Sequence, residues 1–178
     1  LDVHHIIADG TSLGIIINDI NRAYSGEKLE PEEYTSYDLA LDNRDALNSD
    51  AYKNAENYYR SIFEKAGGSI NFYPDKNGPV PTAETYHRET TEVSVQRVKD
   101  FCQKHGITEN VFFIAAFGLT LGKYNFRKDA VFTTIYHGRN DSRLSETVGM
   151  LVKTLPVYCD FSGNAKDYLN GVQEQLIN

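Results

Sequence analysis

The sequence predicts an α+β fold in which helices pack against a mixed sheet. Segments with helical spacing of apolar residues are intermixed with short alternating or β-branched runs. The strict strand-and-helix alternation of a doubly wound parallel sheet is missing. Hydrophobic residues occupy 40% of the 178 positions, which is enough apolar material for one sizeable core.

Residues 1–7 alternate between two faces in the way that predicts a β-strand. His5 shares one face with the apolar residues at the odd-numbered positions, and His4 lies on the other face. The two histidine side chains are therefore expected to point in opposite directions.

The next segment predicts a tight turn followed by an amphipathic helix. Asp9 and Gly10 supply the turn, and Thr11 or Ser12 can cap the helix, which ends at residues 25–26. The apolar stripe of this helix consists of Leu13, Ile16, Ile17, Ile20 and Tyr24. The chain thus opens with strand, turn and helix.

The remaining elements follow from apolar periodicity, caps and glycine stops. Helices are predicted over residues 33–47, 50–66, 95–105, from a cap at Thr108 through 121, and over 165–176. The helix after Thr108 is apolar almost all round, so it is expected to be buried on every side. Extended segments are predicted over residues 86–93, 130–136 and 151–161, with a turn at 137–140.

Residues 67–84 lose all periodicity and contain three prolines beside an Asp-Lys-Asn-Gly run. This composition predicts a linker between two lobes. The predicted organisation is residues 1–66 as the end of a first lobe, 67–84 as the linker and 85–178 as the beginning of a second lobe.

Charge and cysteine content exclude several classes of function. The formal net charge of −7 disfavours nonspecific binding to nucleic acid. Cys102 and Cys159 are far apart and match no zinc-ligand pattern, so a reducing cytoplasm fits best. The longest apolar tract, residues 111–121, is too short and too interrupted to span a bilayer.

One short run near the beginning of the chain places two histidines, an aspartate and a glycine close together. Residues 4–10 read His-His-Ile-Ile-Ala-Asp-Gly, an HHxxxDG pattern. This run resembles the signature of nonribosomal peptide synthetase condensation domains, which belong to the chloramphenicol acetyltransferase-like superfamily. The resemblance implies the two-lobed fold of that superfamily, with His5 facing the reaction tunnel and Asp9 in a structural role.

Two further elements follow in the order that this family shows. Residues 34–40 are similar to its Tyr-x-Asp-Tyr/Phe-Ala element, with the aspartate shifted. Gly138 and Arg139, followed by residues 148–156, resemble its (I/V)GxFVNTLP element, with Lys153 in place of the usual asparagine. Agreement at three places is more specific than any one motif alone.

The resemblance implies transfer of an aminoacyl or peptidyl group from a donor carrier-protein thioester to the amine of an acceptor on a second carrier protein. Both substrates would be carried on 4'-phosphopantetheine, with no cofactor or metal bound directly by the chain. Imidazoles titrate near neutral pH, so His5 could act as a general base or could orient the amine. Both roles stay open.

The other motif residues are expected to support His5. A buried Asp9 carboxylate needs a cation, and the family pattern implies Arg139 as its partner, tying the two lobes together. His4 is expected to be a hydrogen-bonded core residue, and Gly10 to permit the turn and a close backbone approach. A metal site through His4, His5 and Asp9 is disfavoured because adjacent strand residues cannot converge on one ion.

Two other functions are compatible with parts of the sequence. Residues 10–14 match the GxSxG nucleophile elbow, so Ser12 could serve a hydrolase, with Asp129 and His137 in the required chain order. The absence of repeated strand and helix units, and the suitability of Ser12 as a helix cap, disfavour that hypothesis. The second rival is a domain that docks carrier proteins without catalysing a reaction.

The chain is expected to be a truncated piece of a longer synthetase with an adjacent adenylation domain. Because the tunnel of this family lies between complete lobes, the isolated chain is expected to be inactive and to expose apolar surface. A dimer of the fragment would be consistent with such a surface.

Overall fold

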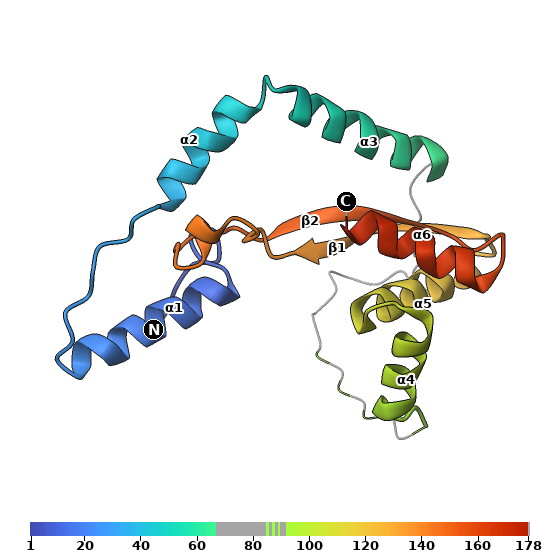
Figure 1. Cartoon of the computed structure of the whole chain (residues 1–178), viewed down its shortest axis with the longest axis horizontal. Helices are drawn as coiled ribbons and strands as arrows, with labels where there is room; N and C mark the ends of the chain where they lie inside the picture. Colours follow the sequence, from blue (N-terminus) through green and yellow to red (C-terminus); the bar gives the residue numbers. More distant parts are fainter. Residues whose placement is uncertain (67–84, 86, 88, 90–91, 178) are drawn as a thin grey trace, which may run out of the picture. The chain divides into compact units, whose positions relative to one another are not determined.

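The computed structural model describes residues 1–66, 85, 87, 89 and 92–177. Helices and a two-stranded sheet make up this part of the chain (Figure 1). The elements are α1 Gly10–Tyr24, α2 Ser36–Ala46, α3 Asp50–Ala66, α4 Val95–His105, α5 Glu109–Tyr124, β1 Asp129–Tyr136, η1 Ser142–Leu144, β2 Lys153–Asp160 and α6 Ala165–Ile177. The predicted mixture of helices and sheet is confirmed.

The described residues fall into two compact units, each built from separate stretches of the chain. One unit comprises residues 1–59 and 135–155, and the other residues 60–134 and 156–178. The predicted linker 67–84 lies outside the described residues, as does half of the predicted strand 86–93, whose described residues 87, 89, 92 and 93 are not in a strand. The lobe boundaries inferred from the sequence therefore stay a prediction.

The helix boundaries follow local capping chemistry. α2 begins at a capping box in which Thr35 Oγ1 accepts from Asp38 N–H at 3.2 Å and Asp38 Oδ2 accepts from Thr35 N–H at 2.9 Å. α5 begins where Thr108 Oγ1 accepts from Val111 N–H at 3.2 Å, as predicted. α4 ends at Gly106, whose φ of 65° provides the left-handed C-cap.

The strand predicted over residues 1–7 is wrong. Backbone from His5 to Ile7 forms a turn, in which Ile7 N–H donates to the carbonyl of His4 at 3.1 Å. A strand exists only where a neighbouring backbone completes its hydrogen bonds, and no described residue pairs with this segment. Alternation in the sequence alone could not provide that partner.

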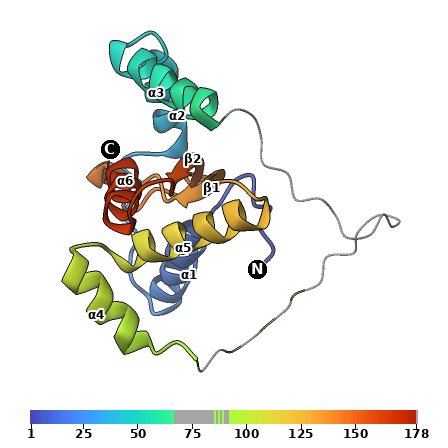
Figure 2. The same cartoon turned by 90° about the vertical axis from the view of Figure 1, so that its right-hand side faces the viewer.

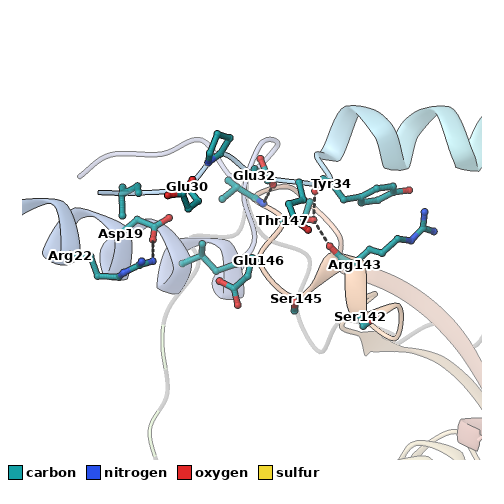
Figure 3. Close-up of a pocket in the computed structure, with 15 residues that line it drawn as sticks. Asp19, Arg22, Glu30, Glu32, Tyr34, Ser142, Arg143, Ser145, Glu146 and Thr147 are labelled. Atoms are coloured by element: carbon teal, nitrogen blue, oxygen red, sulfur yellow. Dashed lines mark hydrogen bonds and ion pairs between the residues drawn. The ribbon is translucent and has the colours of Figure 1, made fainter. Parts of the chain in front are cut away.

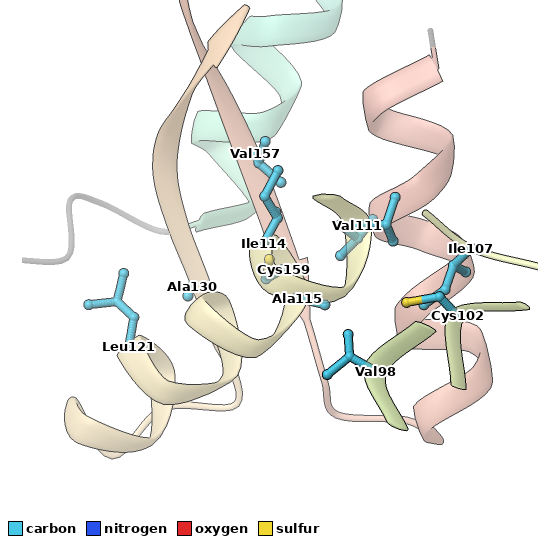
Figure 4. Packing of buried hydrophobic residues seen from close by; sticks show 11 residues of the cluster. Val98, Cys102, Ile107, Val111, Ile114, Ala115, Leu121, Ala130, Val157 and Cys159 are labelled. Atoms are coloured by element: carbon cyan, nitrogen blue, oxygen red, sulfur yellow. The ribbon is translucent and has the colours of Figure 1, made fainter. Parts of the chain in front are cut away.

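The core of the second unit lies between α4, α5, α6 and the sheet (Figure 4). β1 and β2 run antiparallel, since Phe161 N–H donates to the carbonyl of Lys128 and so places the end of β2 beside the start of β1. The buried cluster contains Val98, Cys102, Ile107, Val111, Ile114, Ala115, Leu121, Ala130, Val157, Cys159 and Val172. The three helices and the sheet all contribute side chains to this cluster, so each of them depends on the others for its packing.

Polar contacts fix α6 to its neighbours in this unit. Gln175 bonds both backbone groups of Tyr158 in β2, with Nε2 donating to the carbonyl at 2.7 Å and Oε1 accepting from N–H at 2.9 Å. Tyr168 donates its hydroxyl to the carbonyl of Ala115 in α5 at 2.6 Å. Figure 2 shows α6 beside the two strands in a view turned by 90°.

The expectation that α5 is buried all round is wrong for the described part of the chain. One face contributes to the core, whereas Phe113, Phe117 and Leu119 are exposed. Among the described elements, β1 covers this face only in part, through an edge-to-face contact of Phe132 with Phe117.

The first unit positions the candidate site. The segment between β1 and β2 folds back against the beginning of α1, as the orange chain beside the blue helix in Figure 1 shows. Asp9 N–H donates to the carbonyl of Gly149 at 3.2 Å, joining the two segments through their backbones. Residues from distant parts of the sequence therefore meet at the N-terminus of α1.

Candidate active site

His5 lies in the turn immediately before α1, and its side chain is exposed. Its Nδ1 is 2.8 Å from the carbonyl oxygen of Ala8. A carbonyl only accepts, so Nδ1 carries the proton in this arrangement and the lone pair is on Nε2. Nε2 has no hydrogen-bond partner among the described residues and is free to accept a proton or a hydrogen bond.

His4 does not have the predicted position in a core. Its side chain is exposed, and Nδ1 accepts from Ile6 N–H at 3.1 Å. The expectation depended on a strand with two opposite faces, and the turn at residues 5–7 removes those faces. His4 instead stabilises the local turn.

Asp9 is the N-cap of α1, in place of the predicted Thr11 or Ser12. Its carboxylate accepts from Ser12 N–H and Oγ–H, both at 2.8 Å, and from Leu151 N–H at 3.1 Å. Burial alone would raise the pKa of Asp9, but these hydrogen bonds and one from Arg139 outweigh burial and lower the pKa from 3.8 to about 2. Asp9 is therefore ionised at neutral pH.

Arg139 forms the ion pair with Asp9 that the sequence analysis expected. Its Nη2 lies 3.0 Å from Asp9 Oδ1, and the two side chains are only 7% and 0% exposed. Nη1 donates to the carbonyls of Leu144 at 2.7 Å and Thr147 at 2.8 Å, and only Nε lacks a partner among the described residues. A buried pair needs such additional bonds to offset the loss of hydration.

Gly138 allows Arg139 to reach this position. Its φ is +73°, and a Cβ at this residue would overlap the carbonyl oxygen of Leu151. Gly10 is different: it is the first residue of α1, and an added Cβ would meet nothing within 4 Å. No described residue therefore approaches Gly10 closely, and the close-approach role predicted for it is not found in this part of the chain.

Ser12 is the residue of this site that sequence reasoning misjudged. It is completely buried, and its hydroxyl lies within 3.0 Å of Asp9 Oδ1, Arg139 Nη2 and both backbone groups of Gly149. None of its partners among the described residues is a histidine, and Asp129 is paired with Arg127. The geometry does not form the triad that a serine hydrolase needs.

A cavity of about 380 Å³ lies in the same unit, beside the segment that Arg139 holds (Figure 3). Its wall includes five carboxylate side chains and two guanidinium groups. Figure 3 shows Thr147 beside Tyr34, whose carbonyl accepts from the Thr147 hydroxyl at 2.6 Å. Because His5 does not line this cavity, we assign the cavity no part in the reaction.

The described residues contain no group of three or more His, Cys, Asp or Glu side chains placed to hold a metal ion. In that same part of the chain, no helix is long and apolar enough to cross a membrane. Cys102 and Cys159 are free and buried, and burial raises the pKa of the Cys159 thiol to about 11. The Cys159 thiol is therefore protonated and unreactive at neutral pH.

The family model of the condensation domain matches residues 1–178 of the chain. Bacitracin synthase 2 of Bacillus licheniformis is 28% identical over 185 residues, covering 100% of this chain and 7% of that protein. Tyrocidine synthase 2 of Brevibacillus parabrevis is 30% identical over 159 residues, covering 87% of this chain and 4% of that protein. The chain thus spans a small part of the curated relatives that it matches.

Solved structures agree with the fold. The SgcC5 protein of Streptomyces globisporus matches with a TM-score of 0.73 at 20% identity, over 98% of this chain and 41% of that one. The first condensation domain of the calcium-dependent antibiotic synthetase matches with a TM-score of 0.71 at 17% identity, over 98% and 42%. A four-domain nonribosomal peptide synthetase bound to AMP and glycine matches with a TM-score of 0.75 at 17% identity, over 98% of this chain and 14% of that one.

Proposed function

The chain belongs to the condensation-domain family, and from that membership we propose that it carries the histidine centre of a peptide-bond-forming acyltransferase. The observation that carries the proposal is the state of His5. Its Nδ1–H is fixed on the carbonyl of Ala8, and its Nε2, on an exposed turn, has no partner in the part of the chain that the structure describes. An imidazole in this state is ready to accept from an amine.

The proposed reaction moves an acyl group between two carrier proteins. The donor group arrives as a thioester on the 4'-phosphopantetheine arm of one carrier, and the acceptor amine is held on the arm of the second. The nitrogen attacks the thioester carbonyl, so a C–N bond forms and the C–S bond breaks. The amine loses one proton and the leaving thiolate gains one, which leaves the charge balanced.

His5 has one of two roles in this step. As a general base, Nε2 takes the proton that the amine nitrogen loses. As an orienting group, Nε2 accepts a hydrogen bond that directs the nitrogen lone pair at the carbonyl carbon. Both roles need the same tautomer, with the proton on Nδ1.

Asp9 and Arg139 brace the site and do not transfer protons. Asp9 has a pKa of about 2 and accepts hydrogen bonds from three residues, so its carboxylate stays ionised while the reaction proceeds. Arg139 balances that charge and holds the segment of residues 144–147 through the carbonyls of Leu144 and Thr147. The brace keeps the turn that carries His5 in place.

The partners follow from the same proposal. Donor and acceptor carrier-protein domains bring the substrates, and an adenylation domain adjoins this one in the complete synthetase. A similar four-domain synthetase that binds AMP and glycine supports that neighbour. We place the enzyme in the cytoplasm, and we expect the 178-residue chain to be inactive alone and capable of forming a dimer through its exposed apolar residues.

Reconstitution of the complete domain with loaded carriers tests this function. Mass spectrometry of the acceptor carrier should detect the extended peptidyl thioester when both loaded carriers are present. Omitting the donor acyl group or the acceptor carrier should abolish that mass. Free hydrolysed acyl acid as the sole product would overturn the acyltransferase proposal.

A further inference from the structure

A single peptide unit connects His5 to the rest of the site. The carbonyl of Ala8 accepts from His5 Nδ1 at 2.8 Å, and the N–H of the same peptide, on Asp9, donates to the carbonyl of Gly149 at 3.2 Å. Any shift of Gly149 therefore turns or releases the peptide that fixes the proton on Nδ1.

Ser12 holds Gly149 through both of its backbone groups. Ser12 Oγ lies 2.8 Å from the Gly149 carbonyl and accepts from Gly149 N–H at 3.0 Å. Gly149 has little room to move otherwise, because an added Cβ would lie 2.9 Å from the Cβ of Ser36 and 2.8 Å from Leu151 Cδ1. The Ser12 hydroxyl thus binds Gly149, a residue that its neighbours already enclose tightly.

The remaining capacity of the Ser12 hydroxyl is also used. A hydroxyl offers one donor and two acceptor positions. Arg139 Nη2–H and Gly149 N–H occupy the acceptor positions, and the proton points to Asp9 Oδ1 or to the Gly149 carbonyl. Ser12 is 0% exposed, so solvent water cannot replace these bonds if the hydroxyl is removed.

We propose that Ser12 is a positioning residue for His5, acting through Gly149 and the Ala8–Asp9 peptide to keep the imidazole proton on Nδ1. This inference rests on the proposed function of His5. Without the Ser12 hydroxyl, the Gly149 carbonyl shifts and its hydrogen bond with Asp9 N–H weakens. The Ala8 carbonyl then holds His5 Nδ1–H less firmly, and Nε2 becomes the protonated nitrogen in a larger share of the molecules. The tautomer with Nε2 protonated cannot accept from an amine at that nitrogen.

The test is nitrogen-15 NMR of His5 in the complete domain, comparing wild type, Ser12→Ala and Ser12→Cys at a pH where the imidazole is neutral. Cysteine fills the site with a slightly larger group that forms only weak hydrogen bonds, so it serves if the alanine variant fails to fold. Both variants should lower the ratio of Nδ1–H to Nε2–H tautomer by about tenfold, the effect of one lost hydrogen bond. The kcat should fall while KM stays the same.

Tyr168→Phe is the matched control. The Tyr168 hydroxyl donates to the carbonyl of Ala115 in the second unit, so this variant also loses a side-chain hydrogen bond to a carbonyl, outside the site of His5. It should lower the free energy of unfolding without changing the His5 tautomer ratio. A wild-type ratio in the folded Ser12 variants, or an equal change in Tyr168→Phe, would overturn the inference.

The tautomer measurement needs no turnover, so it separates this inference from the proposed function. If a His5 variant forms as much product as the wild type, the acyltransferase proposal is wrong, whatever the tautomer ratio. If the Ser12 variants keep the wild-type ratio of His5 tautomers, the positioning inference is wrong, whatever the amount of product.

Discussion

Arg139 Nη2 lies 3.0 Å from Asp9 Oδ1, although 130 positions of sequence separate the two residues. Both side chains are almost completely buried, and each has further hydrogen bonds that compensate for its lost hydration. The pair joins the segment that follows β1 to the helix that begins after His5. The predictions below concern this pair, its neighbours and His5.

Removing the cation should destabilise the fold strongly. Arg139→Met leaves the Asp9 carboxylate buried without a countercharge, and we expect the free energy of unfolding to fall by about 3 kcal/mol. Urea unfolding of the complete domain measures it. The matched control is Arg143→Met, which breaks an ion pair with Asp141 whose side chains are 55% and 40% exposed, and should cost less than about 1 kcal/mol. Equal losses would contradict the buried brace.

Acid should weaken the fold through Asp9. Its folded pKa of about 2 lies below the ordinary 3.8, so the stabilisation is present above about pH 4 and is lost as the pH falls toward 2. The shift corresponds to about 2 kcal/mol. Asp9→Asn should be less stable at neutral pH and should lose less stability across that window. Parallel pH profiles for the variant and the wild type would show that Asp9 is not the group responsible.

The Ser12 hydroxyl should be chemically inert. Because the side chain is completely buried and no histidine is among its described partners, a fluorophosphonate probe should not label the complete domain. A serine hydrolase of known reactivity serves as the positive control. Labelling that disappears in Ser12→Ala would revive the hydrolase hypothesis.

Two glycines of the site should respond in opposite ways to alanine. Gly138→Ala meets a positive φ and the carbonyl of Leu151, and should cost at least about 2 kcal/mol of unfolding free energy. Gly10→Ala adds a methyl to open space at the beginning of α1 and should leave stability within about 0.5 kcal/mol of wild type. Thermal unfolding of both variants under one set of conditions provides the comparison.

Local chemistry explains how much of the fold the sequence could predict. The boundaries predicted for α3 and α4 agree with the structure because apolar spacing is a local signal within each helix and because Gly106 ends α4. The strand predicted over residues 1–7 failed because strand formation depends on a partner that local sequence does not reveal. His4 was misplaced for the same reason.

The candidate site was predictable only in part. The HHxxxDG run placed His5 and Asp9 together, and family resemblance supplied Arg139 as the partner of Asp9. The Ser12 contacts with Gly149 span 137 positions and consist of backbone groups, whose location no side-chain pattern encodes. The only local signal in the sequence is a serine three residues after an aspartate, a spacing typical of side chains that bond to each other at the start of a helix.

The most direct test of the central claim is product formation by His5→Ala in the complete domain, supplied with loaded donor and acceptor carriers and followed by mass spectrometry of the acceptor. His105→Ala, at an exposed histidine of α4, is the control for loss of an imidazole. We predict that His105→Ala forms the peptidyl thioester as the wild type does, whereas His5→Ala loses it by at least about a hundredfold. Equal product from His5→Ala and the wild type would contradict the account and leave carrier-protein docking as the function of this chain.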